Sequence, residues 1–360
     1  MVTWLDLPAV DAVDDPRWGW AYHACAWLHR LACQDRYGDA DLALPARVFA
    51  AERSDDTDAD PYLTIGLDGP AGQTESIVAL GWSTHERHAN QDKAEIVVSV
   101  RPDRAGGELG DDLLARFEAI ARQAGRAAAV VTADFSPAED HGPYLSTAEG
   151  GVVPADAWPV ALALRHGYQL GQAERTSRLD LPMDRQRHDD LLADAVTASR
   201  AYRRHVWRDG IPAEWRQGYA DLRAVFVSES PNGMIDWQDE VWDIDRVLRW
   251  EQAKRAGGAV PLIAAAEDGA TGQLVAVSGL TYRDDSPAAT QGVTLVRPDH
   301  RGHRLGVWLK LATHDALRAD AAGVTRVYTE NAQENRHMLA INWAMGFQPY
   351  GGSGAMVKAL

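Results

Sequence analysis

The sequence predicts an α/β (α+β) fold in two tandem domains, and three observations support this prediction. Short apolar runs typical of strands alternate with segments of helical spacing along the chain. The order of these segments in the first half recurs in the second half, roughly 196 residues later. The length of 360 residues is enough for two or three domains of ordinary size, each with its own core.

The first half begins with a segment of helical spacing and continues with strands separated by Gly-rich turns. The predicted elements are a helix over 16–37, strands over 63–66, 77–82 and 95–100, a helix over 111–124 and a strand over 128–132. The alternating apolar run 175–181 ends at Pro182, which is typical of the last strand of a domain. We therefore predict domains of residues 1–178 and 179–360.

The second half repeats this order of elements. The predicted elements are strands over 263–266, 274–280 and 293–296, a Gly-containing loop, a helix from 307 and a strand over 327–331. When residue 100 is aligned with residue 296, two loop glycines coincide in each half: Gly106 with Gly302, and Gly110 with Gly306. This internal repeat implies two domains of one fold.

The most informative stretch is 293–306, where an apolar strand leads through a short basic turn with two glycines into a helix. Backbone N–H groups in the first turn of a helix have no partner within the helix, and the helix dipole favours negative charge there. Such a turn can bind a phosphate or pyrophosphate group. The turn is too short for a P-loop and lacks the three-glycine spacing of dinucleotide-binding folds. Nucleoside triphosphates and dinucleotides are therefore weak candidates for the ligand.

The loop Arg301-Gly302-His303-Arg304-Leu305-Gly306 resembles the pyrophosphate loop of the GNAT superfamily of acyl-CoA-dependent N-acyltransferases. The family pattern is Gln/Arg-x-x-Gly-x-Gly/Ala after a bulged strand, and the loop matches it at Arg301 and Gly306. Arg304 stands where the family usually has its middle glycine. Arginine adds a positive charge beside a phosphate, but it lacks the freedom of glycine to adopt a positive φ.

A second motif downstream strengthens the resemblance. In the family, a strand that ends in Asn is followed by a helix and a Gly-Phe pair, and here Asn331 is followed by Asn335 and by Gly346-Phe347. The resemblance implies that Asn331 and Asn335 contact the pantetheine arm, although Asn also favours loop and helix-cap positions. The resemblance is strong over 291–347 and faint over 1–180.

The resemblance implies that each domain has a mixed, mostly antiparallel central sheet flanked by helices, and that the C-terminal domain binds acetyl-CoA as a co-substrate. The strand backbone would hold the pantetheine and polarise the thioester carbonyl. The loop would bind the pyrophosphate, with Arg304 or Lys310 reaching the 3′-phosphate. The expected cofactor-binding residues are Thr294, Leu295, Val296, Arg301, Gly302, His303, Arg304, Leu305, Gly306, Asn331 and Asn335.

The family chemistry is direct attack of an amine on the thioester. Many family members have, four residues before the Gly-Phe pair, a Tyr that protonates the leaving thiolate, whereas this chain has Asn342. An amide cannot donate a proton as an acid, so Asn342 would hydrogen-bond to the thiolate or carbonyl instead. The candidate bases are Glu330 and, in the acidic and aromatic segment 236–243, Glu240. The alternative for that segment is an amphipathic helix with its tryptophans in the core.

The loop of the first half departs from the motif where charge matters. Ala105 replaces the equivalent of Arg301, and Glu108 takes the place of Arg304. A carboxylate about 4 Å from a pyrophosphate costs a few kcal/mol at intermediate dielectric. We therefore expect the N-terminal domain to be degenerate. The alternative is that Glu108 points to solvent and both loops bind.

Composition and charge disfavour several classes of protein. The net charge of −16 opposes binding to nucleic acid. The chain has neither a long apolar run nor a signal-peptide pattern, so we expect a cytoplasmic protein without a membrane partner. Cys25 and Cys33 are eight positions apart in one predicted helix and cannot form a disulfide. Cys and His lack metal-ligand spacing, so no metal is expected.

The leading hypothesis is an acetyl-CoA-dependent N-acetyltransferase that acts on a primary amine of a small metabolite or antibiotic-like compound. One alternative is a non-catalytic acyl-CoA-binding or regulatory module, which Asn342 and the lack of an obvious base favour. The other is a thiol-biosynthesis acyltransferase similar to mycothiol synthase. The expected partner is a small-molecule amine, and the tandem arrangement favours a monomer or a loose homodimer.

Overall fold

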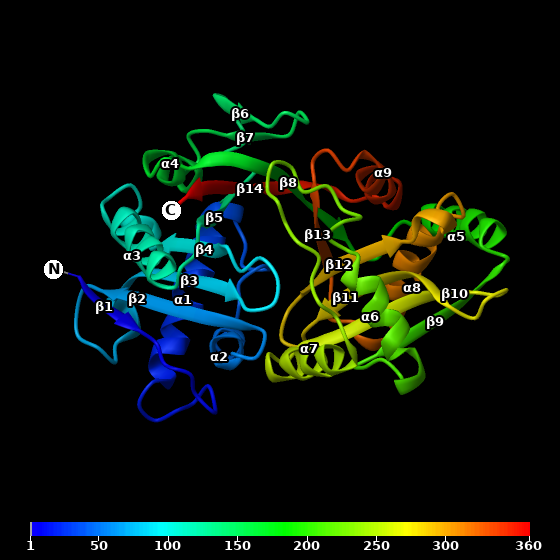
Figure 1. Ribbon diagram of the computed structural model, residues 1–360, viewed down its shortest axis with the longest axis horizontal. Helices are drawn as coiled ribbons and strands as arrows, with labels where there is room; N and C mark the ends of the chain where they lie inside the picture. Colours follow the sequence, from blue (N-terminus) through cyan, green and yellow to red (C-terminus); the bar gives the residue numbers. More distant parts are fainter. Residues whose placement is uncertain (1) are drawn as a thin grey trace. The chain divides into compact units, whose positions relative to one another are not determined.

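The chain folds into two units, each built from a central β-sheet and flanking helices (Figure 1). The structure is a computed structural model and describes residues 2–360. The first unit contains Met1–Glu174, Asn232–Asp236 and Gly351–Leu360, and the second contains Arg175–Pro231 and Trp237–Tyr350. The predicted halves, 1–178 and 179–360, differ from these units because the C-terminal segment and a short internal segment belong to the first unit.

The first unit has a mixed sheet with the strand order β1-β2-β3-β4-β5-β14. Its strands are β1 (Thr3–Asp6), β2 (Ala59–Leu67), β3 (Ile77–Glu86), β4 (Lys93–Val100), β5 (Ala128–Phe135) and the end of β14 (Gln348–Ala359). Neighbouring strands are antiparallel except β4 and β5, which are parallel. The hairpin of β6 (Tyr144–Ser146) and β7 (Val152–Pro154) forms a separate small sheet, and β8 (Gln169–Asp180) begins in this unit.

Helices cover both faces of the first sheet. They are α1 (Gly19–Tyr37), α2 (Ala46–Ser54), α3 (Leu109–Gln123) and α4 (Trp158–Arg165), with the short 3₁₀ helices η1 (Thr74–Ser76) and η2 (Pro102–Arg104) in loops. One core cluster joins α1 and α2 to β2 and β3, through residues such as Leu28, Phe49 and Ile65. A second cluster joins α3 and α4 to β4 and β5, through residues such as Phe117 and Val160.

The second unit repeats this plan, with the strand order β13-β12-β11-β10-β9. Its strands are β9 (Tyr202–Arg208), β10 (Val260–Asp268), β11 (Leu274–Tyr282), β12 (Ala288–Val296) and β13 (Arg326–Ala332), and only β12 and β13 are parallel among them. Its helices are α5 (Arg185–Ala198), α6 (Arg216–Ala224), α7 (Ile244–Ala256), α8 (Leu305–Asp320) and α9 (Arg336–Met345), with η3 (Ala213–Trp215) and η4 (Pro298–His300).

Two core clusters also fill the second unit. Apolar residues of α5, α8 and α9, such as Ala195, Leu309 and Met345, pack on one face of the sheet. Residues of α6 and α7, such as Tyr219 and Val247, pack on the other face. The predicted fold class, two α/β (α+β) domains with mixed, mostly antiparallel sheets, is therefore confirmed.

Some predicted elements begin or end elsewhere in the structure. The helix expected from 307 begins at Leu305, two residues earlier, and the strand expected over 293–296 is the end of the longer β12. The segment 236–243 forms no helix. Its last residue, Asp243, instead caps α7 by accepting a hydrogen bond from the backbone N–H of Arg246 at 2.7 Å.

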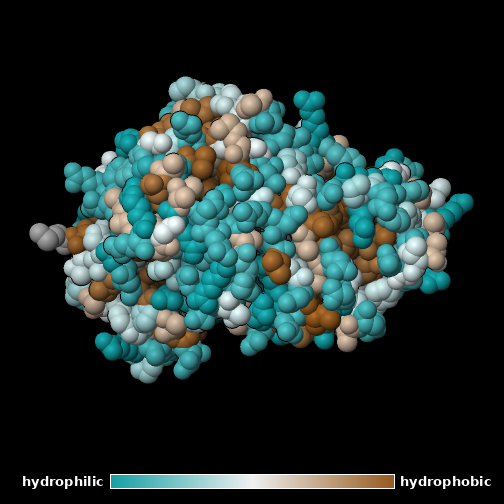
Figure 2. Space-filling view, in the orientation of Figure 1, coloured by the Kyte–Doolittle hydropathy of each residue, from teal (hydrophilic) through white to brown (hydrophobic). Residues whose placement is uncertain are grey.

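The surface is mostly hydrophilic on the face that Figure 2 shows, with hydrophobic side chains in small groups. Across residues 2–360, no helix is both long enough and apolar enough to cross a membrane.

Candidate functional site

A β-bulge interrupts β12 shortly before the loop that leads into α8. Ser278 of β11 pairs with Thr294 of β12, and Leu280 pairs with Gln291. Between these two pairs β12 therefore has one residue more than β11, and the register skips Gly279. A bulge raises the local twist and turns backbone groups out of the regular ladder. The bulged strand expected before the loop is present.

The end of β12 also extends past its parallel partner β13. The paired stretch ends at Gln291 and Thr329, whereas β12 continues to Val296 and β13 to Ala332. In the part of the chain that the structure describes, residues 292–296 therefore have no ladder partner in β13. An open strand edge of this kind can hydrogen-bond to an extended ligand.

The loop between β12 and α8 has the conformation of an anion-binding turn. Gly302 has a φ of 85° and Arg304 a φ of 55°, and α8 begins at Leu305. Within residues 2–360, the backbone N–H groups from Gly302 to Gly306 have no protein acceptor. They lie at the N-terminus of a helix of 16 residues, where the helix dipole favours an anion.

A pocket of about 790 Å³ opens beside this loop. Its volume lies within the usual range of small-molecule sites. It brings together nine of the predicted cofactor-binding residues: Thr294, Leu295, Val296, Arg301, Gly302, Arg304, Leu305, Gly306 and Asn335. The other two, His303 and Asn331, are not among the residues that line it. Asn335 also caps α9 by accepting from the backbone N–H of Met338 at 3.1 Å.

Gly306 keeps the pocket open because it has no side chain. A Cβ added there would lie 3.5 Å from Cδ1 of Ile341, 3.8 Å from Cγ2 of Thr294 and 4.0 Å from Cγ2 of Val296. These are ordinary contacts, so a larger residue would fill the pocket without disrupting the fold. Thr294 and Val296 share this face, whereas Leu295 packs against α6 and α7 on the other face, as the strand alternation predicts.

Two arginines of the loop are half exposed and each faces a carboxylate. Nη2 of Arg301 lies 2.5 Å from Oε2 of Glu229, and Nη2 of Arg304 lies 3.6 Å from Oδ2 of Asp194. The arginine side chains are 54% and 53% exposed. Exposed ion pairs contribute little to stability, so both guanidinium groups are available to a phosphate.

Asn342 lies in the interior and not on the pocket wall. It is 0% exposed, and its Oδ1 accepts a hydrogen bond of 2.5 Å from Nζ of Lys310. Its Nδ2 donates to Oδ1 of Asn331 at 2.7 Å. The expectation that Lys310 reaches a 3′-phosphate is wrong, because this side chain is only 1% exposed. Asn342 is not among the residues that line the pocket, and its catalytic role stays a prediction.

The two candidate bases also lie outside the pocket. Glu330 is exposed on β13 and accepts a hydrogen bond of 3.4 Å from Thr176. Glu240 accepts from Nε1 of Trp242 at 2.8 Å and pairs with Arg246 at 3.0 Å. Trp242 itself is buried in the core cluster beside α6 and α7. Both base assignments stay predictions.

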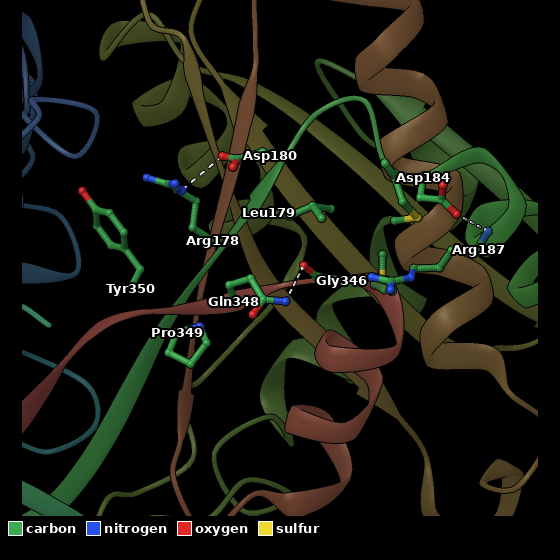
Figure 3. A pocket seen from close by; sticks show the side chains of 11 residues that line it. Arg178, Leu179, Asp180, Asp184, Arg187, Gly346, Gln348, Pro349 and Tyr350 are labelled. Carbon is green, nitrogen blue, oxygen red and sulfur yellow. Dashed lines mark hydrogen bonds and ion pairs between the residues drawn. The ribbon is translucent and has the colours of Figure 1, made fainter.

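A smaller pocket of about 280 Å³ lies among β8, α5 and the segment that joins α9 to β14 (Figure 3). Arg178 pairs with Asp180 at 3.1 Å and lies 5.3 Å from the ring centroid of Tyr350. Arg187 lies beside Gly346, where α9 ends, and a positive charge stabilises the C-terminus of a helix. These contacts give the arginines structural roles, so we place the candidate site in the larger pocket.

The matching strand of the first unit has no bulge. β3 and β4 pair without a register shift from Ala79–Val100 to Thr84–Glu95. An advance of five residues along β4 therefore corresponds to an advance of five residues along β3. In the second unit, an advance of five residues along β12, from Gln291 to Val296, corresponds to only four residues along β11. The first unit thus lacks the irregularity that distinguishes the strand before the loop in the second unit.

The matching loop of the first unit also differs at the start of its helix. Glu108 has a φ of −72°, whereas Arg304 has a φ of 55°. A Cβ added to Gly110 would lie 2.9 Å from the indole ring of Trp158. A tryptophan therefore occupies the space that stays open beside Gly306. Both differences favour a degenerate first site, which stays a prediction.

Sequence reasoning missed several residues of the site. Glu229 reaches the pocket from the loop after α6, and no local pattern in the sequence marks it. Gln291 lies buried beside the bulge, and its only signal is an amide side chain before a glycine, in a strand whose other polar residues are threonines. No group of three or more His, Cys, Asp or Glu side chains within residues 2–360 could hold a metal ion.

Comparisons with known proteins find similar folds in solved structures. The chain matches no protein-family model and no curated protein. A tandem GNAT protein from the clavulanic acid biosynthesis pathway, solved without acetyl-CoA, is 24% identical, with a TM-score of 0.72 over 100% of this chain and 98% of that chain. A GCN5-related N-acetyltransferase from Sphaerobacter thermophilus is 16% identical, with a TM-score of 0.60 over 99% and 95% of the two chains.

A more distant structure shows the same arrangement. A putative acetyltransferase from Pyrococcus horikoshii is 12% identical, with a TM-score of 0.52 over 99% of this chain and 89% of that chain. The tandem neighbour covers nearly all of both chains, which matches the internal repeat described above. The chain therefore has the tandem fold of the GCN5-related N-acetyltransferases.

Proposed function

We propose that the second unit binds acetyl-CoA and transfers its acetyl group to the primary amine of a small molecule. One observation carries this proposal. In a single pocket of about 790 Å³, the end of a bulged strand and the unpaired N–H groups of a helix N-terminus lie beside the side-chain-free Gly306. A pyrophosphate and an extended chain attached to it match these features.

The residues of the pocket fit the parts of acetyl-CoA. The N–H groups of 302–306 would bind the pyrophosphate, and Arg301 and Arg304 would add two positive charges beside it. The open edge of 292–296 would hydrogen-bond to the amide groups of the pantetheine arm. Acetyl-CoA supplies the activated thioester that the transfer consumes.

The transfer forms a C–N bond, breaks the C–S bond and releases CoA as a thiolate. Backbone N–H groups at the bulge would stabilise the negative charge that develops on the carbonyl oxygen, at about 3 kcal/mol for each donor. An ordinary thiol has a pKa of about 8.5, so its thiolate can leave without a protein acid. The attacking amine must lose a proton, and Glu330 and Glu240 remain the candidate bases.

A small-molecule acceptor has two supports. The net charge of −16 opposes a nucleic-acid substrate and suits a cationic amine. The tandem neighbour belongs to the clavulanic acid biosynthesis pathway, which is small-molecule chemistry.

The first experiment is a calorimetric titration of acetyl-CoA into the wild-type protein and two variants. Gly306→Glu would place a carboxylate at the anion-binding turn, and its Cβ would make only ordinary contacts. Gly323→Glu is the matched control, because it adds the same charge at an exposed turn with no atom within 4 Å of the new Cβ. We expect one site in the wild type and the control, and loss of that site in Gly306→Glu. Absence of binding to the wild type would refute the proposal.

The second experiment measures transfer. Acetyl-CoA is mixed with a panel of small primary amines, and release of the free thiol is followed with and without protein. Amine-dependent thiol release in the wild type but not in Gly306→Glu would support the transferase. Binding without release on any amine would favour the non-catalytic acyl-CoA-binding module, for which the buried position of Asn342 is the supporting observation.

A further inference from the structure

The skipped residue of the bulge has a dedicated partner. Gly279 falls between the two registers of β11 and β12, so its carbonyl has no ladder pair in β12. The side chain of Gln291 donates to this residue, since its Nε2 lies 2.7 Å from the oxygen of Gly279. Gln291 is itself only 2% exposed. A buried hydrogen bond of this kind contributes about 1 kcal/mol to stability.

The bond to Gly279 fixes which way the amide of Gln291 faces. A carbonyl can only accept, so the NH₂ group must lie on that side. Oε1 then faces α8, where Nε2 of His314 lies 3.1 Å away and must donate. Burial lowers the pKa of His314 to about 3, so the ring stays neutral with its hydrogen on Nε2. The orientation of Gln291 is therefore set from both ends.

The same NH₂ group determines the direction of the next two hydrogen bonds. Nε2 of Gln291 also lies 3.1 Å from Oγ of Ser278, which therefore accepts. Ser278 is 0% exposed, and the remaining partner of its hydroxyl among residues 2–360 is Oγ1 of Thr294, at 2.8 Å. Ser278 thus donates to Thr294. The hydrogen of the Thr294 hydroxyl is left free to donate elsewhere.

Thr294 lies where such a donor can meet a ligand. Its side chain lines the pocket, and its Cγ2 faces Gly306 at the start of α8. It follows the bulge directly, on the edge of β12 that extends past β13. The hydroxyl hydrogen of Thr294 therefore lies on the part of β12 that would bind the end of the pantetheine arm.

The first unit offers an internal comparison. Its last parallel pair is Ile96 with Val131, in the place of Gln291 with Thr329. Ile96 is buried among apolar residues and β4 has no bulge. The buried glutamine and the bulge therefore occur together in one unit and are both absent from the other.

We propose that Gln291 is a positioning residue that holds the bulge through Gly279 and, through Ser278, turns the hydroxyl of Thr294 into a hydrogen-bond donor for the acyl carbonyl of the bound thioester. This inference rests on the proposed function, because it assumes that acyl-CoA occupies the pocket. Acetyl-CoA and CoA differ only in the acyl group. The hydroxyl should therefore affect their affinities differently.

The test measures the affinities of acetyl-CoA and CoA side by side for the wild type, Thr294→Val, Thr294→Ser and Gln291→Leu. We expect Thr294→Val and Gln291→Leu to weaken acetyl-CoA about tenfold and CoA much less, since one hydrogen bond is worth roughly that factor. Thr294→Ser keeps the hydroxyl and should retain the wild-type ratio. Adding Thr294→Val to Gln291→Leu should change the ratio little further, because Gln291→Leu already removes the donor hydrogen of the Thr294 hydroxyl.

A spectroscopic readout separates positioning from a general loss of structure. The carbonyl stretch of isotope-labelled acetyl-CoA should move to higher frequency in Thr294→Val and in Gln291→Leu than in the wild type, because a donor to the oxygen is lost. An equal loss of both ligands, or an unchanged ratio and stretch, would overturn the inference. If Gln291→Leu fails to fold, Gln291→Met, which keeps an unbranched side chain of similar length without the amide, takes its place. Failure of both ligands to bind the wild type would instead refute the proposed function.

Discussion

Lys310 donates a hydrogen bond of 2.5 Å from Nζ to Oδ1 of Asn342, and both side chains are almost fully buried. The amine lies 5.5 Å from the ring centroid of Phe347, and burial, together with the positive charge of this amine, lowers the pKa of His314. Burial without a carboxylate partner lowers the pKa of Lys310 from 10.5 to about 7. The helix that forms the anion-binding turn thus carries a buried lysine that is about half protonated at pH 7.

The first prediction concerns stability against pH. Between pH 7 and 10.5 the unfolded chain keeps the proton of Lys310 while the folded protein has released it. Raising the pH through this window therefore increases the free energy of unfolding, by at most about 1.4 kcal/mol per pH unit from this group. Urea unfolding at pH 7, 8 and 9 should show a smaller rise in Lys310→Met than in the wild type.

The comparison of the two proteins removes the contribution of other groups. Burial raises the pKa of Cys33 to about 12 and that of Cys25 further, so these thiols lower stability at high pH in both proteins. A difference between wild type and Lys310→Met that stays constant from pH 7 to 9 would contradict a lowered pKa for Lys310.

The second prediction concerns the backbone of Arg304. Its φ of 55° lies in the left-handed region, where a residue with a Cβ is strained by about 1 kcal/mol. Arg304→Gly should therefore raise the free energy of unfolding by about 1 kcal/mol, whereas Arg304→Ala should not. Both variants lose the same positive charge, so both should bind acetyl-CoA more weakly by a similar factor. Unfolding in urea and calorimetric titration measure the two effects; equal stability of the two variants would contradict the argument.

The third prediction concerns Glu229, whose carboxylate lies 2.5 Å from Arg301 at the pocket wall. It competes with a phosphate for Arg301 and repels the phosphate directly. Glu229→Gln should therefore bind acetyl-CoA several-fold more tightly at low salt, and the gain should shrink at high salt. The matched control is Glu214→Gln, an exposed position in η3. Equal gains in both variants would mean that only the net charge of the chain matters.

The repeat and the anion-binding turn could be predicted from the sequence because their signals are local. Glycine and proline fix the loops, and apolar periodicity fixes the strands and helices around them. Gly106 and Gly302 have φ values of 82° and 85°, so two glycines aligned from sequence alone adopt the same conformation.

The features that the sequence does not reveal depend on distant contacts. The last strand pairs with β5, as in Gly352 with Phe135, and a local pattern does not say which strand a segment will join. The resemblance implies that Lys310 could reach the 3′-phosphate, and no local pattern shows that its side chain is 1% exposed; lysine is almost never fully buried. The bulge is implied by the family resemblance alone: it arises because β11 has one residue fewer than its partner between two paired positions, and this difference cannot be counted without knowing the pairing.

The last prediction concerns the cause of the expected failure of the first unit to bind acetyl-CoA. The sequence alone assigns this to the charge of Glu108, but the structure adds Trp158 beside Gly110 and a β4 without a bulge. If charge were the whole cause, Glu108→Arg should create a site. We expect it to create none, because a positive charge neither removes the indole nor shifts the register of β4.

Calorimetry in the Gly306→Glu background tests this, since any remaining heat of acetyl-CoA binding must then come from another site. The matched control is Glu149→Arg, which makes the same charge change at an exposed loop position of the first unit. Saturable binding that appears in Glu108→Arg but not in Glu149→Arg would show that one carboxylate had closed the first site. If acetyl-CoA binds to neither variant, the shape of the first unit, and not its charge, prevents binding there.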